Sequence, residues 1–184
     1  MAIVITHRRT SRLSMRIVKN GDVHVSAPYE TPETEIYAFI EKNKDWIARA
    51  RQKTSDRQET RKAFFDQLPL KTKEQWMDAQ NRLDGIVRPL VERHAKEMGV
   101  QTASIFYRAT ISRWGCCFRG PRSICFSLYL LLLPEWCIEH VVVHELCHLL
   151  QAGHGPRFHS LMDRFYPRWR EANKETNRLS RNNT

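Results

Sequence analysis

The sequence predicts an α+β fold in which a small antiparallel sheet packs on a histidine-bearing helix and on a long amphipathic helix. Three observations lead to this prediction. Short segments with strand composition lie near the N-terminus and again within residues 104 to 130. Apolar residues recur at helical spacing from Lys73 to Met98. Five of the eight histidines gather between His140 and His159, in and just after another apolar segment.

Length and composition limit the architecture. The 184 residues suit one ordinary domain with a small subdomain attached. We expect residues 1–70 to form an N-terminal β-hairpin, a helix and a connection, and residues 71–184 to form the domain that carries the chemistry. The longest apolar run, Leu128 to Leu133, is far shorter than the ~18 residues that cross a bilayer. We therefore expect no membrane segment, and the N-terminus lacks the features of a secretory signal.

The cysteine content indicates a reducing compartment. Five cysteines form an odd set, unlike the even disulfide frameworks of small secreted domains. Cys116 and Cys117 are adjacent, but no second pair at metal-ligand spacing accompanies them, so we interpret them as core or loop residues. The sequence therefore predicts a cytoplasmic protein.

The charge distribution would suit an anionic partner without requiring one. The net charge is +10 and the pI is near 9.7, which attracts polyanions such as DNA. Arg49 to Lys73 carries eight basic and three acidic side chains, and Arg168 to Thr184 carries five and two. We favour two solvated segments over a dedicated nucleic-acid groove, and we keep DNA as a second candidate partner.

The N-terminal part is expected to be a small sheet followed by a helix. Three segments have strand composition: Ile3 to Ile5, Leu13 to Val18, and Val23 to Val25. A turn signal, Asn20-Gly21-Asp22, makes the last two a hairpin. Thr31 and Pro32 then begin a helix that runs to about Arg51. Thr54 to Thr60 is either a connection or a solvated continuation of that helix.

A long amphipathic helix and a ribbon are expected next. The helix spans Lys73 to Met98, with Pro89 as a kink and Gly99 as its stop. Ser104 to Arg108 and Ile124 to Leu130 have strand composition and are separated by a loop, so we expect them to form an antiparallel ribbon.

Two further helices are expected after the ribbon. The first opens at Pro134 and Glu135 and ends near Gly153. The second begins at Pro156 and ends before Pro167. The charged tail beyond it is expected to be exposed.

The first of these helices carries a metal-binding pattern. His144 and His148 are four residues apart, so both imidazoles lie on one side of a helix and can bind one ion. Glu145 lies on the flank of that pair, where a carboxylate can act as a general base without binding the metal. Two stacked histidines can equally be a solvated stripe or core residues. The apolar remainder of the helix and a third histidine favour the metal site.

His154 is the expected third ligand. It follows His148 by six residues and lies just past Gly153, whose expected positive φ would turn the chain back toward the ion. Three nitrogen ligands leave a tetrahedral zinc one open position, which distinguishes a catalytic site from a closed structural one. We rank His140 and His159 below His154, the first as a neighbour of the site and the second as an outer donor or a surface residue.

This arrangement predicts hydrolysis of a peptide bond. Zinc lowers the pKa of its water toward ~7, and Glu145 takes the proton and later delivers it to the leaving amine. The oxyanion also needs a stabilising group. The sequence offers four candidates without choosing between them: Arg113, Tyr129, His159 and Tyr166.

The order and spacing of these motifs resemble those of the YgjP-like metallopeptidases, a bacterial group related to the SprT and WLM zinc peptidases. The matching residues are Ser112-Arg113-Trp114-Gly115, Pro134, Val142 to His148, His154-Gly155-Pro156-Arg157-Phe158, and, in the family opening, the N-terminal hairpin, Phe39 and Trp46-Ile47. The resemblance implies a zincin-like fold for residues 71–184. It also implies the same site residues: His144, His148 and His154 as zinc ligands and Glu145 as the catalytic residue.

The chain departs from the pattern of this group at three positions. The family commonly has serine at Cys116, alanine at Cys147 and an aromatic residue at His140. None of these changes removes a ligand or the base, and a thiol near the metal could make activity redox-sensitive. The histidine spacing also matches that of metzincins, but their glycine would fall at Gln151, so we do not assign the chain to that group.

Two functions are compatible with these residues. The first is a zinc metallopeptidase that acts on a protein or peptide substrate, and the second is a DNA-associated protein with a mainly structural zinc. Glu145 favours the first, because a structural site has no need of a carboxylate beside its ligands. The two can combine, since the resemblance extends to SprT-like peptidases, which act on DNA-bound proteins.

Overall fold

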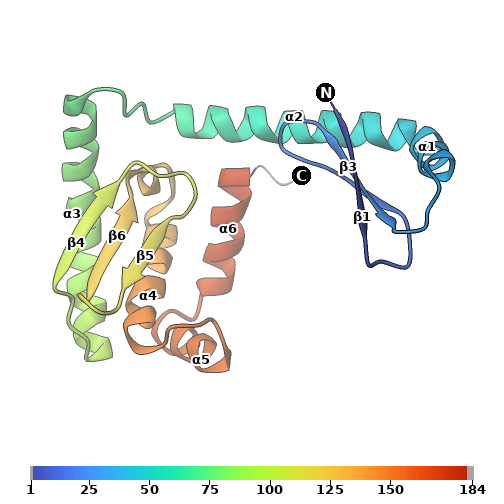
Figure 1. Ribbon diagram of the computed structural model, residues 1–184. Helices are drawn as coiled ribbons and strands as arrows, with labels where there is room; N and C mark the ends of the chain where they lie inside the picture. The colour runs from blue at the N-terminus through green and yellow to red at the C-terminus, as the bar shows by residue number, and fades with distance from the viewer. Residues whose placement is uncertain (1, 182–184) are drawn as a thin grey trace. The chain divides into compact units, whose positions relative to one another are not determined.

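The computed structural model describes residues 2–181 and has an α+β architecture (Figure 1). Within these residues it contains six α-helices, one 3-10 helix and two three-stranded mixed sheets. The predicted class is confirmed, but the prediction that the sheet would be antiparallel was wrong. The chain forms two compact units, Met1–Thr60 and Arg61–Thr184. The division into functional domains between residues 70 and 71 stays a prediction.

The first unit is built on a small sheet with the strand order β1-β3-β2. Its strands are β1 (Ile3–Arg8), β2 (Ser14–Ile17) and β3 (Val23–Pro28). β2 and β3 are antiparallel, so the expected hairpin is confirmed, and β1 runs parallel to β3. Alternate residues of β3 are buried, as expected for a strand with one covered face. They pack on Ile36 and Ile47 from the following helices.

The helix expected to run to about Arg51 is divided in two. α1 (Glu33–Lys42) ends at Asn43, whose side-chain Nδ2 donates to the Phe39 carbonyl at 2.7 Å. This bond offers the backbone an alternative to the helical pattern. The next helix, α2, begins at the following residue and is uninterrupted over its whole length, Lys44–Asp66. Thr54 to Thr60 is therefore a continuation of a helix, not a connection.

The second unit begins its core with α3 (Lys73–Met98), which has the predicted bounds. Thr72 and Gln75 form a capping box at its N-terminus, so two backbone N–H groups that lack helical partners are satisfied. Gly99 has a φ of 66° and ends the helix in the left-handed conformation, as predicted.

The second sheet corrects the predicted ribbon. Its strands are β4 (Ser104–Arg108), β5 (Gly115–Phe118) and β6 (Ser123–Ser127), in the order β4-β6-β5. β4 and β6 are parallel, so the predicted antiparallel ribbon of these two segments was wrong. The antiparallel partner of β6 is β5, which lies in the expected loop. β5 is short and contains glycine and two cysteines, so its composition gives little strand signal.

Helices cover one face of this sheet, as Figure 1 shows for α3 and α4 (Glu135–Leu150). The 3-10 helix η1 (Leu128–Leu132) replaces the predicted end of the strand and leads into α4. α5 (Pro156–Phe165) agrees with the prediction. α6 (Trp169–Arg181) was not predicted, because the residues it buries include the small or polar Ala172, Thr176 and Ser180. No described helix has the length and apolar character needed to span a membrane.

Candidate metal centre

Three imidazoles converge beside α4. His144 and His148 lie on adjacent turns of this helix, and their Nε2 atoms are 3.2 Å apart. The Nε2 atom of His154 lies 3.1 Å from each of them. The structure therefore brings together all three residues that the sequence singled out as ligands.

The chain reaches His154 by a route other than the predicted one. α4 ends at Leu150, and Gln151 follows with extended dihedral angles of −139° and 117°. Within residues 2–181, the glycines with positive φ are Gly21 and Gly99, so the prediction of a positive φ at Gly153 was wrong. An extended residue followed by a short turn reverses the chain here, and no left-handed cap is needed.

Two contacts fix the orientation of the imidazoles. The Nδ1 atom of His148 lies 3.1 Å from the Gln151 carbonyl oxygen. A carbonyl only accepts, so Nδ1 carries the proton and Nε2 directs its lone pair toward the other two rings. The buried ring of Phe158, from α5, lies 4.7–4.9 Å from each of the three imidazole rings, measured between centroids. The Phe158 ring therefore packs against all three imidazoles and helps to hold them in place.

Burial keeps the helical imidazoles neutral. It lowers the pKa of His144 to about 3, and the neighbouring histidines add to this effect. Burial is also the main cause of the lowered pKa of His148. Only a neutral imidazole has a free lone pair for a metal ion, so these shifts favour metal binding over protonation.

The donor set fits a divalent metal ion. The three Nε2 atoms face one another, and a cation between them can accept a lone pair from each neutral imidazole. A tetrahedral zinc ion with nitrogen ligands at about 2.0–2.1 Å requires a nitrogen spacing of about 3.3 Å. The observed spacing of 3.1–3.2 Å is close to this value.

Glu145 lies next to the triad but has a different environment. Its side chain is only 5% exposed. Burial raises the pKa of this carboxyl to about 8, while the charge of Arg113 and a hydrogen bond from the Cys117 backbone N–H act in the opposite direction. Gly115 approaches the carboxyl so closely that a Cβ there would lie 2.6 Å from Oε1. β5 thus holds Glu145 in place through its backbone.

A protein-family model described as the YgjP-like metallopeptidase domain matches residues 11–80 and 67–179. This chain belongs to the YgjP-like metallopeptidase family. Among solved structures, the metallopeptidase zymogen abylysin of Pyrococcus abyssi shares 21% sequence identity with it, at a TM-score of 0.46. That match covers 50% of this chain and 91% of the other. No curated protein matched this chain.

The other polar residues considered from the sequence of this YgjP-like chain are spread around the site. His140 is buried, with its ring centroid 6.0 Å from that of His144. His159 is exposed and stacks on Trp169. Tyr166 donates its hydroxyl proton to the Trp136 carbonyl at 2.7 Å. Of the four candidates for oxyanion stabilisation, Arg113 is the one whose charge acts on Glu145.

Two thiols near the site of this metallopeptidase, Cys117 and Cys147, are held in their protonated form. Burial raises the pKa of Cys117 to about 11 and that of Cys147 to about 12. Because the thiolate is the reactive form, neither residue is a reactive thiol at neutral pH.

Sequence reasoning missed three contributions to the site. Gly115 was noted only as part of a family motif, and the Cys117 backbone was not considered at all. The sequence around Gly115 does not indicate its contact with Glu145, because that contact depends on which strand packs over α4. Nothing in the sequence indicated the third contribution, the packing of Phe158 against all three imidazoles.

Proposed function

We propose that this chain is a zinc-dependent metallopeptidase of the HExxH type that hydrolyses peptide bonds in a protein or peptide substrate. Its zinc ligands are His144, His148 and His154, within a zincin-like catalytic domain of residues 71–184. The observation that carries the proposal is the convergence of three Nε2 atoms at 3.1–3.2 Å beside a buried carboxyl group. Family membership supports the reaction class.

Zinc is the proposed metal because the donor set is purely nitrogen. Imidazole suits zinc, whereas magnesium and calcium prefer oxygen ligands. When bound, such an ion acts as a Lewis acid that polarises a carbonyl group and acidifies water. Three protein ligands suit a catalytic zinc, which keeps a position for solvent or substrate, better than a structural zinc with four.

Glu145 is the proposed general base. Its carboxylate takes a proton from the attacking water as the oxygen adds to the peptide carbon, and then transfers that proton to the leaving amine nitrogen. A neighbouring cation favours the ionised carboxylate and so lowers its pKa from the value set by burial. The Cys117 N–H and the close approach of Gly115 keep the carboxylate in one position throughout.

We also propose that the protein works in the reducing cytoplasm. All five cysteines lie within the described residues, and all are free thiols. An odd number of free thiols agrees with a compartment in which disulfides do not persist.

The test compares the wild type with Glu145→Gln. We expect both proteins to bind about one zinc per chain, measured by plasma mass spectrometry, because Glu145 is not a ligand. Cleavage of casein should fall by at least about 100-fold in the variant, since general-base catalysis is lost. Glu135→Gln is the matched control, because Glu135 lies on the same helix but is exposed, and it should cleave normally.

Retained cleavage by Glu145→Gln would reject the assignment of the base. A protein that binds zinc and DNA but cleaves nothing, with or without DNA, would instead support the DNA-associated function with a structural zinc.

A further inference from the structure

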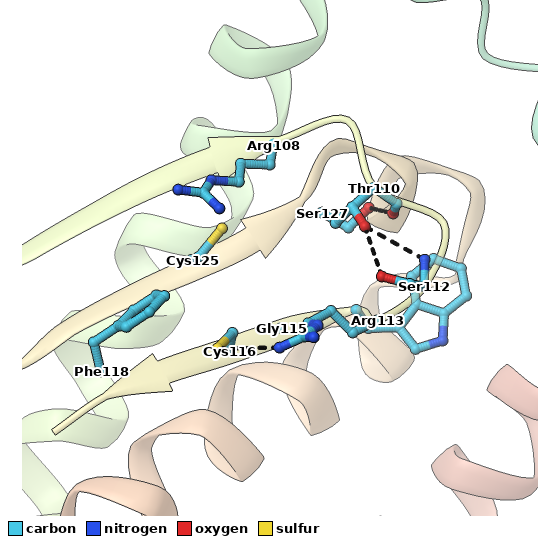
Figure 2. Close-up of a pocket in the computed structure, with 10 residues that line it drawn as sticks. Arg108, Thr110, Ser112, Arg113, Gly115, Cys116, Phe118, Cys125 and Ser127 are labelled. Carbon is cyan, nitrogen blue, oxygen red and sulfur yellow. Dashed lines mark hydrogen bonds between the residues drawn. The ribbon is translucent and has the colours of Figure 1, made fainter.

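The face of the β4-β6-β5 sheet opposite α4 carries a pocket that the proposed chemistry does not use. Ile124 and Phe126 face the core, so Cys125 between them faces the other way. Figure 2 shows this outer face, where a cavity of about 270 Å³ lies over β5 and β6. Its lining residues are Arg108, Thr110, Ser112 to Cys116, Phe118, Cys125 and Ser127.

Two arginines from different elements bring positive charge to this pocket. Arg108 belongs to β4, and its guanidinium lies 5.4 Å from the centre of the Phe106 ring. Arg113 comes from the loop before β5 and donates to Cys116 Sγ at 3.7 Å. In Figure 2 the Arg108 side chain lies beside Cys125 and the Arg113 side chain lies beside Cys116. Aromatic and sulfur contacts thus orient both groups without neutralising them.

Neither arginine is paired with an acidic group among residues 2–181. The ion pairs found there all involve other basic side chains. No aspartate or glutamate lines the pocket. Its other polar groups include three hydroxyls: that of Ser127 donates to the Thr110 carbonyl at 2.6 Å, and those of Thr110 and Ser112 lie 3.0 Å apart. A pocket with two unpaired guanidinium groups and three hydroxyls is suited to an anion.

The pocket adjoins the catalytic carboxyl across a single strand. Gly115 lines the pocket and also approaches Glu145 closely. The charge of Arg113 acts on Glu145 as well. β5 is an edge strand of its sheet, so a peptide bound at the metal centre can pass over this edge toward the pocket, where it meets Arg113 first and then Arg108 on β4, two strands away.

We propose that this pocket binds a carboxylate of the peptide substrate and makes the enzyme select acidic peptides. The proposal rests on the proposed peptidase function and adds the substrate class. The cavity of about 270 Å³ has the size of a side chain or a chain terminus. The carboxylate comes from a glutamate or aspartate side chain or from the C-terminus, and both present the same two oxygens to a guanidinium.

Binding to the zinc-loaded Glu145→Gln protein tests the proposal without turnover. The probes are fluorescent peptides of about ten residues, acetylated and amidated at their ends, in which one glutamate is moved through the sequence. Each has a glutamine counterpart, and a further set has glutamine and a free C-terminal carboxylate. We expect at least one glutamate peptide to bind about tenfold more tightly than its glutamine counterpart at low salt, with the difference shrinking as salt is added.

Substitutions test whether the two arginines cause the preference for glutamate peptides. Arg108→Gln and Arg113→Gln, each added to the Glu145→Gln protein, should remove most of the tenfold preference while leaving the affinity for glutamine peptides within about twofold. Arg108→Glu should favour a lysine peptide instead. The control is Arg164→Gln, which removes an exposed arginine of α5 and should preserve the preference.

Each other outcome has a definite meaning. If only the peptides with a free C-terminal carboxylate bind more tightly, the pocket recognises a carboxylate and the C-terminus supplies it. Equal binding of glutamate and glutamine peptides, or no peptide binding at all, would overturn the proposal. It would also be overturned if Arg108→Gln abolished binding of a DNA oligonucleotide and the protein showed no preference among peptides. If acidic peptides bind selectively but the wild type cleaves none, the pocket stands and the peptidase function fails.

Discussion

The two faces of β5 differ in how closely they are packed. On the inner face, Gly115 lies so close to Glu145 that a Cβ there would clash with it, and the Cys117 backbone N–H donates to the same carboxyl. On the outer face, Phe118 is 40% exposed and Cys116 borders an open pocket. One short strand therefore separates a tightly packed side from an open one. If the proposed roles of Glu145 and of the pocket hold, substitutions on the outer face should alter substrate preference and leave the reaction itself unchanged.

The largest difference between the two faces should be in stability. Phe126, from the adjacent strand β6, is fully buried on the inner face of the same sheet, so Phe126→Ala should lower the free energy of unfolding by about 3–5 kcal/mol. Phe118→Ala on the outer face loses mainly a ring contact with Phe106, at 5.8 Å between centroids, and should cost about 1 kcal/mol. Urea unfolding followed by circular dichroism measures both. Equal losses would show that the outer face is as tightly packed as the inner one.

A second difference concerns the charge buried on the inner face. In the metal-free protein, the pKa of Glu145 is raised from its usual 4.5 to about 8, so the folded state holds this proton more tightly than the unfolded chain. The contribution of Glu145 to stability is therefore lost as the pH rises from about 4.5 to about 8. Across this pH range the Glu145→Gln variant should become more stable relative to the wild type. The difference in their free energies of unfolding should reach a few kcal/mol at pH 8.

Unfolding midpoints at several pH values, with a chelator present, check this prediction. A constant difference between the two proteins from pH 5 to pH 8 would contradict it, because a glutamine does not titrate and the wild-type carboxyl would then have an ordinary pKa.

The smallest predicted effect concerns glycine substitutions in and near β5. Gly115→Ala pushes the Glu145 side chain aside and should lower kcat/KM by about tenfold, which equals about 1.4 kcal/mol, with zinc content unchanged. Gly120→Ala is the control, since a Cβ at Gly120 meets nothing within 4 Å. Equal activity in Gly115→Ala and the wild type would mean that β5 does not position the carboxylate.

The sequence predicted best what depends on short spacings. The interval between His144 and His148 is set by helical geometry, and the nearby His154 had only a short turn to cross. The lengths of α3 and α5 followed from apolar periodicity and from their proline and glycine boundaries.

Long-range pairing was harder to predict. Residues 104 to 108 and 124 to 127 have strand composition, but alternation does not encode which strand lies beside which, or in which direction. α6 escaped notice because it buries Ala172 and two hydroxyl residues in a strongly charged segment. The role of Gly115 depends on tertiary packing and has no local signal.

The position of His154 outside α4 has a consequence for metal affinity. Two imidazoles are already aligned by one helix, and the third follows only ten residues after the first. Bringing the third into place closes a short loop, and the entropy cost of closure grows with loop length. Ordering the chain then costs little of the free energy of coordination, so this arrangement favours tight retention of a bound metal ion even when the free ion is scarce.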